Sequence, residues 1–430
     1  LMNTLCFQTV AEIPAEELAK RLNNQKNFTI QPGITLREKT KISLGEARIK
    51  AVHQYTRQEL TYKKNLNLKL SLETGVYLVG ENVYDQQGLY VQYENKDGVA
   101  VQKFVSALLD KLPLILVEPN LEARVQQLQG CYYPANASAY KENNLRGPVW
   151  AHLSWLIYAL NGAWGRYTSN PLDRRLLRQL RVRLRWLRAV LSFFRPVLKA
   201  TECSLWQQRL RSTGLELGSL RELDVMLLSL EKMQQATEEG QSVPYGLYKY
   251  FDKRRKLKLQ KLQKGLQLKH HTLALASFVL WLQGQPFYPN YQQTTFDQLA
   301  IKRLKKWSKE LLINTANRDI LTDMKKAHGA RIRIKKLRYV LLSLVEFGHD
   351  NEKLLRILKK LQDTLGVMHD DYVNGQMVQK LKTGGKIQRE EILLFSGWES
   401  AKVESSLLQL EVLWQQFGTE LAEWRKRLTR

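Results

Sequence analysis

The periodicity of hydrophobic and polar positions changes once along this chain of 430 residues, near residue 143. Between residues 28 and 104, short stretches of alternating polarity predict β-strands, and the apolar run at residues 112–118 predicts a further buried strand. Residues 15–23 predict a helix, and the Asp97–Gly98 pair predicts a hairpin turn. The first part of the chain is therefore expected to form a β-rich domain.

From residue 149 onward the hydrophobic positions recur with the period of an α-helix. Long segments rich in Leu, Lys and Arg are separated by short breakers, which predict six to eight helices in antiparallel bundles. We expect an α+β protein with a smaller β-rich domain at residues 1–142 and an all-α domain at residues 143–430. The boundary loop contains Pro134, Asn136 and Gly147–Pro148, and the later breakers are Asn170–Pro171, Arg195–Pro196, Gly240 with Pro244, residues 286–289, Gly348 and Gly384–Gly385.

An internal repeat divides the helical part into two halves. The segment RQLRVRLRWLR at residues 178–188 aligns without gaps with HGARIRIKKLR at residues 328–338, at an offset of 150 residues. A second pair, LELGSLRELDV at residues 215–225 and DTLGVMHDDYV at residues 363–373, follows at an offset of 148 residues. Two motifs in the same order at nearly the same offset predict a tandem duplication, with half-repeats at about 143–285 and 286–430.

Each copy of the first motif places a row of cations beside a row of apolar side chains. At 100° per residue, the cations of each copy fall within one arc of about 80°. Because this arc adjoins the apolar arc instead of lying opposite it, the cations are predicted to line a groove or cavity between bundles. The first stripe consists of Arg178, Arg181, Arg185 and Arg188, and the second stripe of His328, Arg331, Lys335 and Arg338.

The usual explanation for such a row is a solvated face, on which Lys and Arg stems cover apolar surface. Residues 178–188 contain no carboxylate, however, so that like charges repel at helical spacing, and the same arrangement occurs twice. We therefore predict a bound anion of high charge density. Arginine binds two phosphate oxygens at once, and rows of arginines would follow a linear phosphate chain. Nucleic acid stays open as a partner, although Trp186 and Tyr339 are expected to pack between helices.

Composition agrees with an anion-binding protein. Of the formal net charge of +26, residues 1–140 carry +2 and the remainder carries +24. Basic runs at residues 251–264 and 301–310 are interpreted as solvated faces first and binding surfaces second. Three widely spaced cysteines indicate reduced thiols, and the apolar runs are shorter than the ~20 residues that span a bilayer. We expect a cytoplasmic protein without a transmembrane segment, a cofactor or a metal site.

At these motifs the chain resembles the CHAD family, the conserved-histidine α-helical domain. This family carries a helix of the type His-x-x-Arg-Val-x-x-Arg-Arg-Leu-Arg in each half, followed by a Leu-Gly-x-x-x-Asp motif. Residues 328–339 and 361–370 match the second-half form, and residues 181–188 and 217–225 match the first-half form. The resemblance implies two pseudo-symmetric antiparallel helical bundles whose basic inner surfaces bind polyphosphate, with Arg221, Lys336 and Tyr339 as secondary site residues.

The chain departs from the family pattern at three positions. Arg178 stands where the family usually has its histidine, Trp186 replaces an arginine, and Glu222 replaces an aspartate. The loss of one histidine argues against a metal or phosphohistidine site that needs both, whereas an anion site keeps its cation. The Asp370–Asp371 pair is expected to cap a helix or to pair with a stripe cation.

CHAD domains often follow a CYTH domain, the triphosphate tunnel fold, which hydrolyses triphosphate with a metal held by strand carboxylates. Residues 1–142 have the corresponding position and strand character but lack the Glu-x-Glu-x-Lys signature. Arg37, Lys39 and Lys41 alternate onto one strand face without a row of carboxylates that could hold a metal. A degenerate, catalytically silent relative and an unrelated β-rich domain both stay open.

The sequence thus predicts a non-enzymatic protein that binds inorganic polyphosphate, or a similar polyanion, through the two stripes. No catalytic residue is assigned. One alternative is an inorganic triphosphatase whose N-terminal domain performs the chemistry and whose basic domain gathers the substrate. The other alternative is a nucleic-acid-binding protein.

Overall fold

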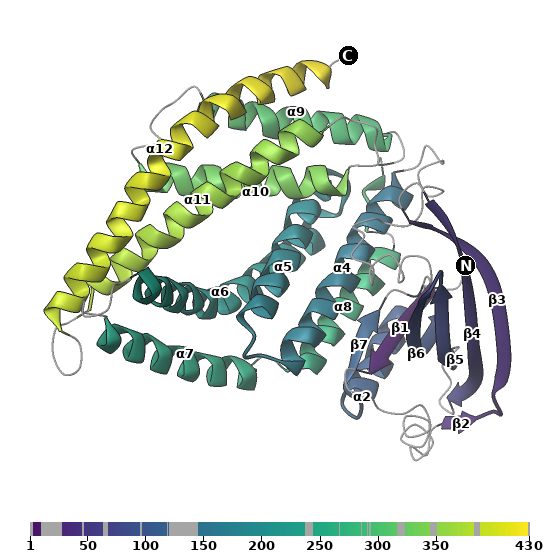
Figure 1. Ribbon diagram of the computed structural model, residues 1–430. Coiled ribbons are helices and arrows are strands. Elements are labelled where there is room, and N and C mark those ends of the chain that lie inside the picture. Colours follow the sequence, from purple (N-terminus) through teal and green to yellow (C-terminus); the bar gives the residue numbers. More distant parts are fainter. Residues whose placement is uncertain are drawn as a thin grey trace. The chain divides into compact units, whose positions relative to one another are not determined.

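The computed structural model combines an antiparallel sheet with a series of long helices (Figure 1). It describes residues 3–9, 28–44, 47–62, 68–94, 97–117, 119, 145–236, 244–265, 267–284, 286–289, 291, 294–315, 323–344, 351–381 and 388–428. The predicted α+β class, with an N-terminal sheet and a helical C-terminal part, is confirmed. The predicted helix at residues 15–23 and the breakers Gly240, Gly348 and Gly384–Gly385 lie outside the described residues.

Seven strands in the described part of the chain form one sheet. Its order is β2-β4-β5-β6-β1-β7, with β3 also paired to β4, and every pair is antiparallel. The tight β5–β6 turn requires Gly80, which has a positive φ of 59°. The strands are β1 (Asn3–Thr9), β2 (Phe28–Ile30), β3 (Ile34–Leu44), β4 (Ala47–Tyr62), β5 (Lys69–Val79), β6 (Asn82–Tyr93) and β7 (Leu114–Val117).

The two faces of this sheet differ in chemistry because side chains alternate along each strand. One face carries the buried apolar residues Phe7, Leu72 and Leu89. The other face carries polar residues, with Arg57 of β4 opposite Glu73 of β5. The apolar face forms the core, so the polar face is available for another role.

The predicted hairpin turn at Asp97–Gly98 is wrong. These two residues instead start helix α2 (Gly98–Leu109), for which Asp97 is the N-cap residue. Its buried residues recur with helical spacing and include Val101, Phe104 and Leu108. The Asp-Gly pair suits a helix start as well as a hairpin, and the helical period that follows decides between them.

Nine helices follow in the described chain, one more than the upper end of the predicted range. The difference comes from two helix boundaries that the sequence pattern did not mark, one after Gly265 and one between Thr315 and Met324. Gly147 and Pro148, expected in a boundary loop, lie in the first turn of a helix, where proline is tolerated. The helices are α4 (Arg146–Ser169), α5 (Arg174–Phe194), α6 (Ala200–Ala236), α7 (Tyr245–Gly265), α8 (Leu268–Gln283), α9 (Phe296–Thr315), α10 (Met324–Ser343), α11 (Glu352–Gln379) and α12 (Arg389–Arg427).

The chain divides into two compact units, and the division crosses the helical part. The first unit contains Leu1–Arg183, Arg195–Trp206 and Leu266–Gln292, and the second contains Leu184–Phe194, Gln207–Gly265 and Gln293–Arg430. In the first unit α4 and α8 pack against β7, and Asn161 of α4 donates to the backbone oxygen of Leu116 at 3.0 Å. The sheet therefore shares a compact unit with helices of the first half-repeat.

The internal repeat extends to the starts of the stripe helices. The carboxylate of Asp173 accepts a hydrogen bond from the backbone of Arg175, and that of Asp323 accepts hydrogen bonds from the backbones of Lys325 and Lys326. Both residues are N-caps, and they are separated by the same 150 residues as the two stripes. An N-cap satisfies backbone donors that the helix itself leaves unpaired. The two stripe helices thus begin at equivalent positions.

No helix in the described chain is long and apolar enough to cross a membrane. Two of the three cysteines, Cys6 and Cys203, are described, and both are buried free thiols. Burial raises the pKa of the Cys203 thiol to about 11, so this sulfur stays protonated at neutral pH.

Candidate anion-binding site

The second unit brings the helices of the two stripes into direct contact. The indole of Trp186 on α5 stacks on the ring of Tyr339 on α10, with 5.7 Å between ring centroids. The indole Nε1 donates a hydrogen bond to Ser343 Oγ at 2.7 Å. Both aromatic rings are buried. Inter-helix packing, the expectation for these two residues, is therefore what they provide.

Burial follows the same order along both stripes. The first residue of each stripe, Arg178 or His328, is exposed, and the three residues after it are partly buried. The six partly buried residues are Arg181, Arg185, Arg188, Arg331, Lys335 and Arg338. The division between the units falls within α5, so that Arg178 and Arg181 belong to the first unit and the other six stripe residues to the second. A solvated face would leave such side chains exposed over their whole length.

Arg331 is a largely enclosed cation of the second stripe. Its side chain is 14% exposed and contacts Asp370 on α11, with 3.4 Å between Nη2 and Oδ1. The pKa of Arg331 is lowered, mainly by burial and also by the charge of Arg185, against the opposite effect of Asp370. The expected pairing of Asp370 with a stripe cation is thus observed, and a single carboxylate does not offset the cost of burying this charge.

A second group of mutually repelling cations surrounds Arg188. Burial and the charge of Arg211 on α6 lower the pKa of Arg188. Burial and the charges of Arg188 and Arg333 lower the pKa of Lys336, one of the secondary site residues. Cations from α5, α6 and α10 therefore share a region in which each weakens the charged state of another.

Four stripe arginines present a buried donor that the protein does not satisfy. In each case the guanidinium Nε is inaccessible to solvent and has no hydrogen-bond partner among the described residues. An unsatisfied buried donor costs about 1–3 kcal/mol, and more when it is charged. The four residues come from both stripes: Arg185, Arg188, Arg331 and Arg338.

Two histidines meet at the start of the second stripe. The rings of His328 on α10 and His369 on α11 lie 4.5 Å apart between centroids. Burial and the charge of Arg331 lower the pKa of His328 and bring that of His369 to about 4. Both imidazoles are therefore neutral at pH 7, although they stand among cations.

Glycines in or next to the Leu-Gly motifs lie close to these cations. A Cβ atom on Gly366, the glycine of the second motif, would lie 3.8 Å from Arg331 Nη2, and a Cβ atom on Gly214, the residue before the first motif, would lie 4.0 Å from Arg188 Nη1. The secondary residue Arg221 is partly buried on α6. Asp224 instead forms a buried ion pair with Arg255, at 2.6 Å. The acid of the first motif therefore forms a structural ion pair, whereas Asp370 of the second motif pairs with a stripe cation.

Sequence reasoning did not assign His369, Arg211 or Gln362 to the site. Gln362 accepts a hydrogen bond from Arg338 Nη1 at 3.5 Å. His369 and Gln362 lie on α11 next to the second Leu-Gly motif, so a helical-wheel comparison of the two motif pairs would have indicated them. Arg211 lies before the first Leu-Gly motif on α6, and nothing in its local pattern distinguishes it from a solvated arginine.

The structure describes the side chains of two of the three cations that alternate along β3. Arg37 and Lys39 are exposed, whereas Glu38 faces a pocket on the polar side of the sheet. The side chain of Lys41 lies outside the described residues. Within the described part of the chain, no three His, Cys, Asp or Glu side chains are arranged so that they could hold a metal ion.

The chain is similar to proteins of a known family. The family model of the CHAD domain matches residues 163–379. Two similar solved structures are the CHAD domain from the plant Ricinus communis (21% identity, TM-score 0.46, 63% of this chain and 92% of that chain) and PptA from Streptomyces chartreusis (16% identity, TM-score 0.48, 63% and 99%). No curated protein matches the sequence.

Proposed function

Since the chain belongs to the CHAD domain family, we propose that it binds inorganic polyphosphate without catalysing a reaction, through the stripes on α5 and α10. The residues proposed to contact the phosphate chain are Arg178, Arg181, Arg185, Arg188, His328, Arg331, Lys335 and Arg338. Arg221 and Lys336 extend this surface, and Tyr339 supports it from the interior.

The observation that carries the proposal is the group of partly buried arginines that repel one another. Arg185, Arg188, Arg331 and Arg338 keep a buried Nε without a partner in the described protein, and neighbouring cations lower the pKa of Arg188 and Arg331. Folding brings these cations together at a cost, which a polyanion offsets by supplying negative charge to the side chains, which stay partly exposed. Arginine suits this role because its planar guanidinium binds two oxygens of one phosphate.

Two features favour a bare phosphate chain over nucleic acid. Single-stranded nucleic acids are commonly held by aromatic rings on which bases stack. Trp186 and Tyr339, which lie on the stripe helices, are buried against each other and present no ring to a base. The cations are furthermore repeated along two helices, which suits a ligand whose charge repeats at every unit.

A competition experiment tests the proposed ligand. Full-length protein would be titrated with a fluorescently labelled polyphosphate, and unlabelled polyphosphate or single-stranded RNA would be added at equal phosphate concentration. We expect polyphosphate to displace the probe at a concentration at least tenfold lower than RNA. Displacement by RNA at the lower concentration would assign the stripes to nucleic acid.

The absence of turnover needs its own measurement. Protein incubated with triphosphate and Mg²⁺ or Mn²⁺ is expected to release no phosphate above background, because metal-assisted phosphoryl transfer requires carboxylates that hold the ion. Metal-dependent release that is lost when Glu38 or Glu59 is replaced with Gln would instead support the triphosphatase alternative.

A further inference from the structure

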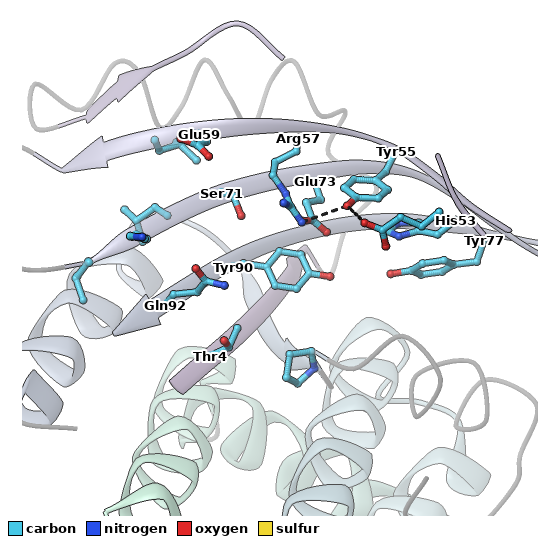
Figure 2. Close-up of a pocket in the computed structure, with 16 residues that line it drawn as sticks. Thr4, His53, Tyr55, Arg57, Glu59, Ser71, Glu73, Tyr77, Tyr90 and Gln92 are labelled. Atoms are coloured by element: carbon cyan, nitrogen blue, oxygen red, sulfur yellow. Dashed lines mark hydrogen bonds and ion pairs between the residues drawn. The ribbon is translucent and has the colours of Figure 1, made fainter. Parts of the chain in front are cut away.

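The polar face of the N-terminal sheet contains a cavity that the stripes do not explain. Its volume is about 640 Å³, which lies within the range of about 300–1,000 Å³ common for small-molecule sites. All of its lining residues belong to the first compact unit. The labelled side chains in Figure 2 project into it from β1, β4, β5 and β6, and Glu38 of β3 also lines it.

Polar side chains in this cavity are buried to an extent that is unusual for the solvated face of a sheet. His53, Tyr55, Glu73 and Tyr77 are each at most 5% exposed. Burying polar groups is unfavourable unless they are hydrogen-bonded or serve a ligand. The burial of these polar groups around a cavity is therefore typical of a binding site and not of an apolar core.

A chain of hydrogen bonds fixes the middle of the cavity. Arg57 Nε donates to Glu73 Oε1 at 2.8 Å, and Arg57 Nη2 lies 2.7 Å from the same oxygen. Arg57 Nη2 also donates to the hydroxyl of Tyr55 at 3.2 Å, and that hydroxyl donates to Glu38 Oε1 at 2.8 Å (Figure 2). Three strands thus hold these side chains in one arrangement before any ligand binds.

This chain of bonds also decides the sign of the charge that the cavity offers. Glu73 neutralises Arg57, the cation at the centre. The remaining charged groups among the described lining residues are Glu38, Glu59 and Lys69, whose sum is one negative charge. The cavity is therefore acidic within a protein whose formal net charge is +26. The formal charge of the described lining therefore favours a cation over a polyanion.

Aromatic rings line the cavity beside these charges. Tyr55 and Tyr77 are almost fully buried, and Tyr55 is stacked on His53 at 3.8 Å with the guanidinium carbon of Arg57 5.4 Å from its ring centroid. Among the described tyrosines of the lining, the partly exposed Tyr90 can therefore contact a ligand. The face of an aromatic ring attracts ammonium and guanidinium groups when they are removed from water. Within the described part of the chain, the carboxylates are not grouped so that they could hold a metal ion, so Glu38 and Glu59 beside a partly exposed ring fit an organic cation better.

From this geometry we propose that the cavity binds a small organic cation with ammonium or guanidinium groups, which lie between Glu38, Glu59 and the ring of Tyr90. The site is separate from the stripes and binds the opposite charge. Together the two proposals give one chain a site for a polyanion and a separate site for a small organic cation.

Calorimetric titration of the full-length, polyphosphate-free protein with spermidine tests this proposal. The double variant Glu38→Gln and Glu59→Gln is expected to weaken spermidine binding at least tenfold, and Lys69→Gln is expected to strengthen it severalfold. Damage to the fold would not produce changes of opposite sign. Glu81→Gln, at an exposed position of the β5–β6 turn outside the cavity lining, serves as the control and should leave the affinity unchanged.

Two results would overturn the proposal. Spermidine could bind the wild type and the double variant equally, or fail to bind either, so that the cavity does not recognise organic cations. Alternatively, triphosphate with Mg²⁺ could bind more tightly than spermidine, with the binding lost in Arg57→Gln, so that the cavity is an anion site. Loss of polyphosphate binding to the stripes would leave this inference untouched, because the two measurements use different ligands and different variants.

Discussion

Trp186 and Tyr339 stack on each other across α5 and α10, and the indole Nε1 of Trp186 also donates to Ser343 Oγ. This contact joins the two basic stripes through their buried sides. Both rings are buried in this contact. The relative position of the two rows of cations consequently depends in part on an apolar contact beneath them.

The Trp186 contact predicts a graded loss of stability. Trp186→Phe keeps a stacked ring and loses one hydrogen bond, so it should lower the free energy of unfolding by about 1 kcal/mol. Trp186→Ala removes the ring and should lower it by about 3–5 kcal/mol. Chemical denaturation of both variants would measure these values, and equal losses would mean that the hydrogen bond carries the contact.

Arg188 and Arg338 occupy equivalent positions in the two halves, so their loss should have equivalent effects. Arg188→Gln and Arg338→Gln should each weaken polyphosphate binding about tenfold or more, since a hydrogen bond to a charged group contributes about 1.5–3 kcal/mol. Each should also reduce the slope of log affinity against log salt concentration by about 0.7, by analogy with single-stranded nucleic acids.

The matched control for these arginines lies on α9. Lys302 and Lys309 are exposed, and replacing both with Gln removes more charge than either arginine variant does. A small effect of the α9 variant would confirm that position matters. If all of these variants lost affinity in proportion to charge, the stripes would be ordinary solvated faces.

Binding of polyphosphate should be coupled to proton uptake by His328 and His369. Both have a pKa below the ordinary value of 6.5, that of His369 being about 4. A nearby polyanion favours the charged imidazole, so the affinity should rise as the pH falls from 6.5 toward 4. The double variant His328→Gln and His369→Gln should flatten this rise in titrations at several pH values, relative to the wild type with the same ligand.

The same histidines predict the opposite pH trend for the stability of the free protein. Because its pKa is depressed on folding, His369 binds fewer protons in the folded than in the unfolded state between pH 6.5 and about 4. Stability should therefore fall as the pH decreases through this window. Thermal unfolding with and without polyphosphate would show whether the ligand reverses the trend. A wild-type protein whose stability does not change over this range would contradict the assignment.

Gly366 should limit the size of side chains beside Arg331. A Cβ atom at this position would lie 3.8 Å from Arg331 Nη2, an ordinary contact distance, so Gly366→Ala should bind polyphosphate nearly as well as the wild type. Gly366→Leu places further carbons where the guanidinium lies and should weaken binding at least tenfold. Helix content, measured by circular dichroism, should stay the same in both variants, and an equal loss of affinity in both would argue against a steric effect.

Much of the helical part could be predicted from the sequence because its information is local. The repeat from Arg178 to Arg188, and again from His328 to Arg338, shows both the helix period and the position of the cations. Contacts between these helices could not be predicted in this way. Nothing in the local pattern places Arg211 beside Arg188 or His369 beside His328, because those pairs depend on how α5, α6, α10 and α11 pack.

The sheet was harder to predict for a related reason. Whether Asp97 begins a hairpin or a helix depends on the residues that follow it, and the hairpin prediction considered only the pair itself. Glu38, Glu59 and Glu73 come from three strands, and their position at one cavity follows from the pairing register. A one-residue shift in register would move a strand's side chains to the other face. Alternation along one strand does not contain this information.

The caps Asp173 and Asp323 make the two halves of the chain comparable residue by residue. Helices that begin at equivalent carboxylates present their later positions at equivalent angles. A substitution at any stripe position therefore has an internal counterpart 150 residues away, with the same secondary structure and a similar charge but its own neighbours. The same substitution can therefore be made at both positions of a pair. A difference between the two variants then reports the effect of the environment separately from that of the residue type.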